Sequence, residues 1–183
     1  MMKYYGISFD EECEDNPTGC GTGIGTVDEN YKKIAKMIHR NQGTMLDIEV
    51  EQIKVKLDNN VFGDFFSTNI MNIYSEKLQQ IIEKHKSPND YIEWFEVNVY
   101  NDEESRKYYA LHFTKLFDLI DYDKSYCYND VVIIPTYRKE LVKEHNIFLK
   151  SKYSDFPIVC QTIKDEIEKN NLIGMSFNEV KIK

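Results

Sequence analysis

Residues 71–84 (MNIYSEKLQQIIEK) and residues 156–169 (FPIVCQTIKDEIEK) align without a gap, and these two stretches decide how the chain is organised. Each begins with a short run rich in apolar residues. Each then continues with apolar residues three and four apart, the spacing that places them on one face of a helix. The aligned apolar pairs are Ile73 with Ile158, Leu78 with Ile163, and Ile82 with Ile167. The stretches therefore predict two copies of a strand that runs into an amphipathic helix.

Each predicted helix leads to a similar second strand, over residues 94–99 in the first copy and 177–182 in the second. The complete strand–helix–strand units span about 70–99 and 156–182. Two copies are too few for a solenoid, which is built from three or more repeats. The pattern has two interpretations: a duplicated half-domain, or two ordinary units of a common kind that are alike by coincidence.

The two predicted helices differ at their first residue. Ser75 is suited to cap the free N–H groups at the start of the first helix. Cys160 stands at the aligned position of the second helix. We expect Thr162 to provide the cap there.

The remaining patterns predict mostly strands. Asp28 is the expected N-cap of a helix that ends before Gly43, with apolar residues at helical spacing between them. Val131–Ile134 is a short apolar run before Pro135 and is predicted to be a buried strand. Further strands are expected over residues 3–9, 45–57, 108–115 and 147–149, and a short helical segment within 138–146.

These elements predict an α+β fold with a mixed or mostly antiparallel sheet and a few packed helices. The strands are too many for an all-helical fold, and the helices too few for a doubly wound sheet. We expect one domain over residues 1–183, either undivided or built from two lobes at about 1–100 and 101–183.

Composition excludes several classes of function. The 183 residues carry a net charge of -8, and 42% of them are hydrophobic. Such a surface repels nucleic acid and anionic membranes, and no run of Lys or Arg is longer than a pair. We therefore expect neither a nucleic-acid nor a membrane partner. A basic protein partner fits the charge, although many inert cytosolic proteins are also acidic.

The cysteines indicate a reducing compartment. Cys13, Cys20, Cys127 and Cys160 contain no CxxC pair and have no histidine at zinc-finger spacing. The chain also opens without the apolar stretch of a secretory signal, and no segment approaches the roughly 18 apolar residues of a membrane helix. Reduced thiols and a soluble, cytoplasmic protein are the expectation.

An acidic segment near the start is the candidate partner contact. It consists of Asp10, Glu11, Glu12, Glu14 and Asp15. The order of the acids does not match a calcium-binding EF-hand loop. A solvated loop is the simplest interpretation, and a contact surface for a basic protein is the second.

The glycines that follow do not form a phosphate-binding loop. Gly21, Gly23 and Gly25 are spaced GxGxG, whereas a dinucleotide fingerprint needs GxGxxG directly after a strand. The Lys-Ser/Thr pair of a P-loop is also missing. We expect a flexible loop over residues 19–25.

The sequence predicts no catalytic residues, no cofactor and no metal. None of His39, His85, His112 and His145 has a second histidine at the spacing of a local metal pair. Asp118 and Asp121 lie in a turn-like segment, where aspartates commonly form Asx turns. The alternative is a small-molecule or nucleotide-modifying enzyme, with a site assembled from Asp118, Asp121 and His112.

Five short motifs are similar to those of one bacterial protein family. They are Met2-Lys3-Tyr4-Tyr5, Asp121-Tyr122-Asp123-Lys124-Ser125, Ile147-Phe148-Leu149-Lys150, Ile158-Val159-Cys160-Gln161-Thr162-Ile163-Lys164, and Gly174-Met175-Ser176-Phe177. Together they resemble an immunity-protein family of polymorphic toxin systems, long catalogued as a domain of unknown function. The resemblance covers roughly residues 70–183 and the opening strand, and Cys160 stands where the family usually has Ser.

The resemblance implies a function without bond-making chemistry. Such a protein binds a cognate toxin made by the same bacterium and blocks it by occlusion, with exposed acids and aromatic residues as contacts. An acidic inhibitor can also associate quickly with a basic toxin through electrostatic steering.

Overall fold

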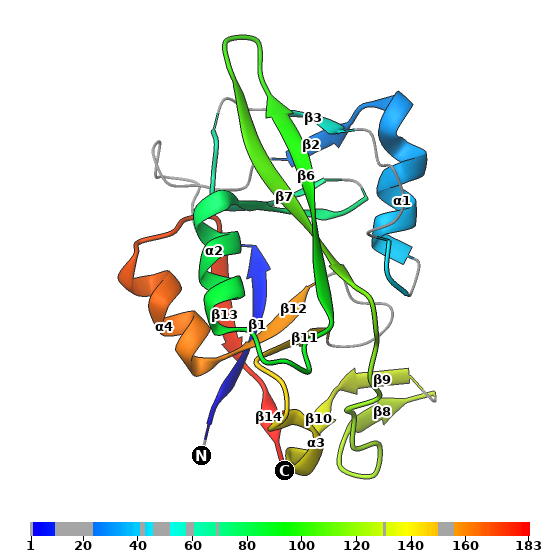
Figure 1. Ribbon diagram of the computed structural model, residues 1–183. Coiled ribbons are helices and arrows are strands. Elements are labelled where there is room, and N and C mark those ends of the chain that lie inside the picture. The colour runs from blue at the N-terminus through cyan, green and yellow to red at the C-terminus, as the bar shows by residue number, and fades with distance from the viewer. Residues whose placement is uncertain are drawn as a thin grey trace.

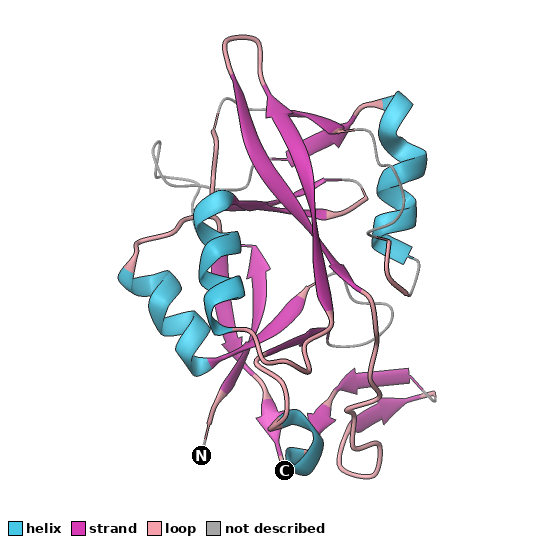
Figure 2. Ribbon diagram, in the orientation of Figure 1, coloured by secondary structure: helices cyan, strands magenta, loops and turns pink. Residues whose placement is uncertain are grey.

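The computed structural model describes residues 2–9, 24–40, 43–45, 52–57, 61–68, 70–129, 131–149 and 156–183. Its described part is α+β, with mixed and antiparallel sheets and a few helices, as the sequence predicted. Figure 1 shows a barrel in the upper half, a second sheet below it, and helices against both. In Figure 2 the helices lie along the outside of the strand layers.

The barrel closes in the strand order β2-β3-β6-β7-β5-β4. Its β2–β4 and β3–β6 pairs are parallel and its other pairs are antiparallel. Alternate residues of β3 are buried and exposed, which directs its apolar side chains into the barrel core. The strands are β2 (Ile24–Val27), β3 (Ile53–Leu57), β4 (Phe65–Thr68), β5 (Asn72–Ser75), β6 (Ile92–Tyr100) and β7 (Ser105–Phe113).

One helix covers the side of the barrel. Asp28 accepts a hydrogen bond from the N–H of Asn30 and so caps a single 3-10 turn (η2, Glu29–Tyr31) that leads into α1 (Lys32–Arg40). Ala35 and Ile38 of α1 are buried against the barrel. The segment ends near Gly43, whose φ of 98° lies in the left-handed region that favours glycine. The predicted N-cap and the predicted helix are both confirmed.

The second sheet has four antiparallel strands in the order β11-β12-β1-β13. They are β11 (Ile147–Leu149), β12 (Pro157–Cys160), β1 (Tyr4–Phe9) and β13 (Met175–Glu179). Two helices, α2 (Glu76–His85) and α4 (Gln161–Lys169), pack against each other beside it. Glu166 of α4 joins them, because its carboxylate pairs with Lys84 at 2.6 Å and with His85.

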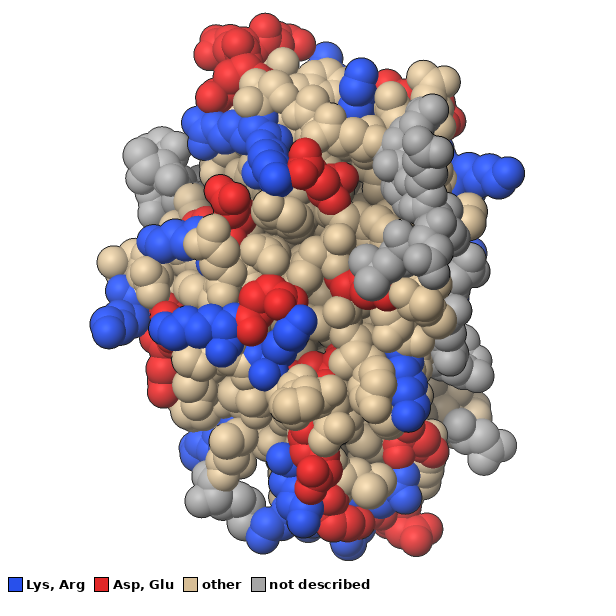
Figure 3. Space-filling view, viewed as in Figure 1, with Lys and Arg blue, Asp and Glu red and all other residues tan. Residues whose placement is uncertain are grey.

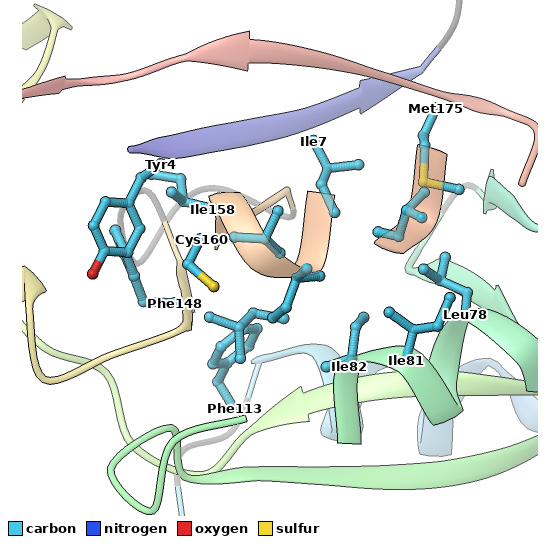
Figure 4. Packing of buried hydrophobic residues seen from close by; sticks show 14 of the residues in the cluster. Tyr4, Ile7, Leu78, Ile81, Ile82, Phe113, Phe148, Ile158, Cys160 and Met175 are labelled. Carbon is cyan, nitrogen blue, oxygen red and sulfur yellow. The ribbon is translucent and has the colours of Figure 1, made fainter. Parts of the chain in front are cut away.

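A shared core lies between this sheet and α2. In Figure 4, Leu78, Ile81 and Ile82 of α2 lie opposite residues of the second sheet such as Ile7 and Met175. Because the barrel residues Phe65 and Tyr74 belong to the same cluster, the barrel and the sheet are packed through one core.

The two strand–helix–strand units have equivalent topology. β5 and β6 both pair antiparallel with β7, whereas β12 and β13 both pair antiparallel with β1. The middle strands are alike in sequence: residues 107–113 read KYYALHF and residues 3–9 read KYYGISF. Each unit is therefore two strands joined by a helix, with a third strand inserted between them.

The register of the two units also agrees. Ser75 lies opposite Tyr108, and the aligned Cys160 lies opposite Tyr4. Each unit carries the same ion pair across its second strand: Lys107 with Glu96 at 2.7 Å, and Lys3 with Glu179 at 2.8 Å.

Five short elements complete the described chain below the second sheet. β10 (Thr136–Tyr137) pairs in parallel with β14 (Lys181–Ile182), and α3 (Lys139–Val142) follows β10. A hairpin of β8 (Tyr126–Tyr128) and β9 (Val131–Ile134) forms a separate two-stranded sheet. Figure 1 shows this hairpin projecting from the lower edge of the molecule, at the end opposite the long β6–β7 hairpin.

Candidate protein interface

The acidic cluster that the sequence offered as a partner contact lies outside the described residues. This holds for Asp10, Glu11, Glu12, Glu14 and Asp15, and for most of the glycine-rich loop. Gly25 is described, and it lies in β2 rather than in a loop. A Cβ atom on Gly25 would come within 2.6 Å of Val55 Cγ1, so close strand packing accounts for this glycine.

The three residues proposed for the enzymatic alternative each interact with neighbouring groups of the protein. His112 is buried on β7, and its ring nitrogens lie within hydrogen-bonding distance of the main-chain carbonyl oxygens of Ile38 and Gly43. Asp118 accepts from the N–H of Ile120 at 3.4 Å. Asp121 pairs with Lys124 at 2.7 Å, and that hydrogen bond lowers the pKa of Asp121.

His112, Asp118 and Asp121 therefore share no partner within the described part of the chain. His112 holds α1 and the segment after it against the barrel, and the two aspartates shape the segment after β7. Their observed contacts are those of structural residues.

A buried acid and a buried histidine that sequence reasoning did not single out do come together. Asp90 and His145 are 2% and 5% exposed, and His145 Nδ1 lies 3.4 Å from Asp90 Oδ1. The Asp90 carboxylate also accepts from the N–H groups of Ser87 (2.6 Å) and Asn146 (3.0 Å). Burial raises the pKa of Asp90, against the lowering effect of these donors and of His145.

The Asp90 cluster ties the loop before β6 to the segment that joins α3 and β11. The Tyr4 hydroxyl reinforces it by donating to the main-chain carbonyls of Val142 and His145, both at 3.0 Å. Because the Asp90 carboxylate is buried and accepts main-chain N–H groups of the protein itself, with the His145 ring packed beside it, we assign the cluster a structural role. Among the described residues, no group of three or more His, Cys, Asp or Glu is placed to hold a metal ion.

Among the described residues, most of the exposed large apolar side chains lie in the β8–β9 hairpin. Tyr126, Tyr128, Val131, Ile133 and Ile134 are each between 49% and 64% exposed. Val131–Ile134 is indeed a strand, but the prediction that it is buried is wrong. An apolar run specifies extended backbone without specifying what covers it, and here no other strand pairs with the hairpin in the described chain.

A register shift gathers these side chains on one face. Tyr126 lies opposite Ile134, Cys127 opposite Val132, and Tyr128 opposite Val131, with an irregularity between Tyr126 and Cys127. Ile133 and Ile134 together therefore oppose the single residue Tyr126, as in a β-bulge. Since residues directly opposite each other share a face and neighbours alternate, Tyr126, Tyr128, Val131 and Ile134 lie on one side.

We call this side, together with the bulge residue Ile133, the apolar face of the hairpin. Cys127 and Val132 lie on the reverse side. Val132 is only half-buried and Cys127 is exposed with a free thiol. Two features of the sequence could have indicated this exposed face. The β9 strand lacks alternating polar residues, and β8 has a tyrosine at every second position.

Side-chain hydrogen bonds hold the base of the hairpin. The Ser125 hydroxyl donates to the carbonyl of Asp121 (2.6 Å) and accepts from the N–H of Thr136 (2.9 Å). Thr136 in turn donates from its side chain to the carbonyl of Lys124 at 2.9 Å. The Asp121–Ser125 motif therefore clamps the two strands where they leave the body, so that their exposed part projects from a fixed base.

Charge does not mark a comparable region on the face in Figure 3. Acidic and basic side chains are interspersed over that face, without a large area of one sign. The contiguous exposed apolar side chains of the hairpin are typical of an interaction site. Within the described chain, no helix has the length and hydropathy to cross a membrane.

Comparison with known proteins identifies the family. A model of the immunity protein family Imm11 matches residues 46–182, which is most of the chain. A comparison with curated proteins found no match. The matched region includes α2, α4, the β8–β9 hairpin and every strand from β3 to β13. The chain therefore belongs to the immunity protein family Imm11.

Proposed function

We propose that this protein binds a cognate bacterial toxin and neutralises it by occlusion, without altering the toxin covalently. The observation that carries the proposal is the exposed apolar face of the β8–β9 hairpin, on a chain of an immunity family. The chemically capable groups, His112, Asp121 and the Asp90–His145 pair, are engaged with the protein itself. Binding therefore accounts better for the surface than catalysis does.

The charge and the thiols support the place and manner of action. A net charge of -8 favours rapid encounter with a basic toxin, because complementary charge mainly increases the association rate. The exposed Cys127 is free, which suits a reducing compartment. We propose that the inhibitor acts in the cytoplasm of the cell that makes it.

The test is co-expression with the toxin domain encoded beside this chain's own gene. We expect rescue of growth, a stoichiometric complex on size-exclusion chromatography, and a toxin of unchanged mass that regains activity after denaturing separation and refolding. Failure to rescue would overturn the immunity proposal. A toxin that stays inactive and gains or loses mass would overturn occlusion and revive the enzymatic alternative.

A further inference from the structure

We propose that the apolar face of the β8–β9 hairpin is the surface that contacts the toxin, and that its site there is an apolar groove bordered by lysine or arginine. This proposal rests on the proposed function, and it adds which residues bind the toxin and which kind of site on the toxin binds them. Three independent features of the hairpin lead to it: its exposed area, its anchoring and its charge.

The exposed area is the first feature. At roughly 200 Å² per aromatic side chain and somewhat less per aliphatic one, five side chains about half exposed offer on the order of 500 Å² of apolar surface. Scattered single apolar residues are normal on a protein surface, but a contiguous patch of this size is typical of an interaction site. Tyrosine is also enriched among the residues that dominate binding energy.

The anchoring is the second feature. An isolated two-stranded hairpin is at best marginally stable in water. Here the Ser125 and Thr136 hydrogen bonds and the Ile120–Tyr137 bridge fix its base, and Tyr137 is fully buried. A hairpin held this way loses little conformational freedom on binding, which favours affinity. The bulge at Ile133–Ile134 adds a further apolar side chain opposite Tyr126.

The charge of the segment is the third feature. Residues 116–134 contain four aspartates and one lysine, which gives a formal charge of -3. Lys124 pairs with Asp121, and Arg138 also lies close to Asp121, whereas Asp123 is exposed beside the hairpin. An apolar face with acidic neighbours is complementary to an apolar groove with a basic rim.

The same features argue against a second copy of this chain as the occupant. Two hairpins meeting face to face would bury on the order of 1,000 Å² in total, at the low end for a specific interface. The contact would also bring two segments of charge -3 together, which like-charge repulsion disfavours. The same negative charge attracts a basic toxin and repels a second copy of this chain.

Side-chain variants test the contact against the purified, catalytically inactivated toxin domain encoded by the neighbouring gene. Tyr128→Ser and Ile134→Ser, on the apolar face, are expected to raise the Kd by about tenfold or more each. Cys127→Ser, on the reverse side of the same strand as Tyr128, is the matched control and should leave the Kd within about twofold. Unchanged thermal unfolding of each variant verifies that the fold is intact.

Charge variants test the chemistry of the groove. Asp123→Asn beside the hairpin should lower the association rate by several-fold at low ionic strength, and the effect should shrink in high salt. Glu103→Gln removes the same charge from the tip between β6 and β7, at the opposite end of the molecule, and should change the rate less. If the two variants lowered the association rate equally, the charge would act by general electrostatic steering, and the proposal of a basic rim around the groove would be wrong.

The outcomes separate this proposal from the proposed function. If the wild-type chain rescues cells but Tyr128→Ser and Ile134→Ser keep full affinity, the hairpin contact is wrong and the immunity function stands. Amide exchange of residues 126–134 that is equally fast with and without toxin would say the same. A hairpin-dependent dimer in sedimentation at micromolar concentration would replace the toxin with a second copy.

Discussion

Ser75 and Cys160 occupy the same position of two aligned units, but only Ser75 caps its helix with a side-chain hydrogen bond. The Ser75 hydroxyl donates to Asp64 at 2.7 Å and accepts from the N–H of Leu78 at 3.2 Å, so it caps α2. Cys160 is the N-cap of α4 and makes no side-chain cap bond. Thr162, the expected substitute, lies within the first turn of α4 and is exposed, so that expectation is wrong: an N-cap must precede the helix.

This difference predicts unequal costs for two similar substitutions. Ser75→Ala should lower the free energy of unfolding by about 1–2 kcal/mol, because it removes the cap of α2 and one of the two hydrogen bonds to the Asp64 carboxylate, the other coming from the N–H of Ile173. Thr162→Ala removes a hydroxyl that has no capping role and should change stability by less than about 0.5 kcal/mol. Urea unfolding of both variants measures the difference, and a larger loss for Thr162→Ala would contradict the assignment.

Replacing either of two glycines by alanine should affect stability differently. Gly25→Ala places a Cβ 2.6 Å from Val55 Cγ1 and 3.2 Å from Phe66 Cε2, and this overpacking should cost about 1–3 kcal/mol. Gly6→Ala meets nothing closer than 3.8 Å, and Ala110 already stands at the corresponding position of β7. Gly6→Ala should therefore be neutral or slightly stabilising. Thermal unfolding distinguishes the two, and equal losses would contradict the packing argument.

At the scale of elements, the Asp90 carboxylate links the loop after α2 to the segment before β11, and it predicts a dependence on pH. Because burial raises its pKa above the ordinary value of 3.8, folded Asp90 binds more protons than unfolded Asp90. Its contribution to the free energy of unfolding is therefore greatest at low pH and falls as pH rises from about 4 through the folded pKa.

The measurement compares Asp90→Asn with the wild type at pH 4 and pH 7. The variant should be less stable by about 1–3 kcal/mol at pH 4, because an amide nitrogen cannot accept one of the main-chain N–H bonds. Its deficit should be smaller at pH 7, where the wild type also carries the cost of a buried charge. A deficit that is equal or larger at pH 7 would show that burial does not dominate.

Local pattern predicted the elements better than it predicted what they touch. The spacing of Leu78 and Ile82, and of Ile163 and Ile167, predicted both helices correctly. Apolar residues four apart form a single stripe along a helix, and that stripe is the face that becomes buried. The apolar run of β9 specified a strand but not its exposure, because exposure depends on which other elements reach it. Asp90 and His145, far apart in sequence, have no local pattern that would bring them together.

On the scale of the whole molecule, the two units differ in chain order but not in geometry. In the first, the middle strand β7 follows β6 directly; in the second, the middle strand β1 comes earliest in chain order and β13 near its end. The matching registers and the matching ion pairs favour duplication over coincidence. We propose that the units derive from one ancestral strand–helix–strand–strand segment, and that the second is circularly permuted.

This proposal predicts that the chain tolerates the reciprocal permutation. Joining residue 183 to residue 2 through a flexible linker of about ten residues is feasible, because Figure 1 shows both ends on the same side of the molecule. Opening the chain between Asp102 and Glu103 then gives the first unit the order that the second has now. That tip is exposed, and opening it breaks no strand pairing.

The permuted chain should fold as a cooperative monomer with the same circular dichroism and a melting temperature lowered by only a few degrees. The loss comes from the Asn101 side chain, which accepts from the N–H groups of Glu103 and Glu104 in the intact turn. A second permutant opened within α2, between Gln79 and Gln80, is the control and should not fold, because it interrupts the helix that fills the shared core. If the tip permutant also failed, the β6–β7 connection would be essential to the first unit, and the two units would not be equivalent.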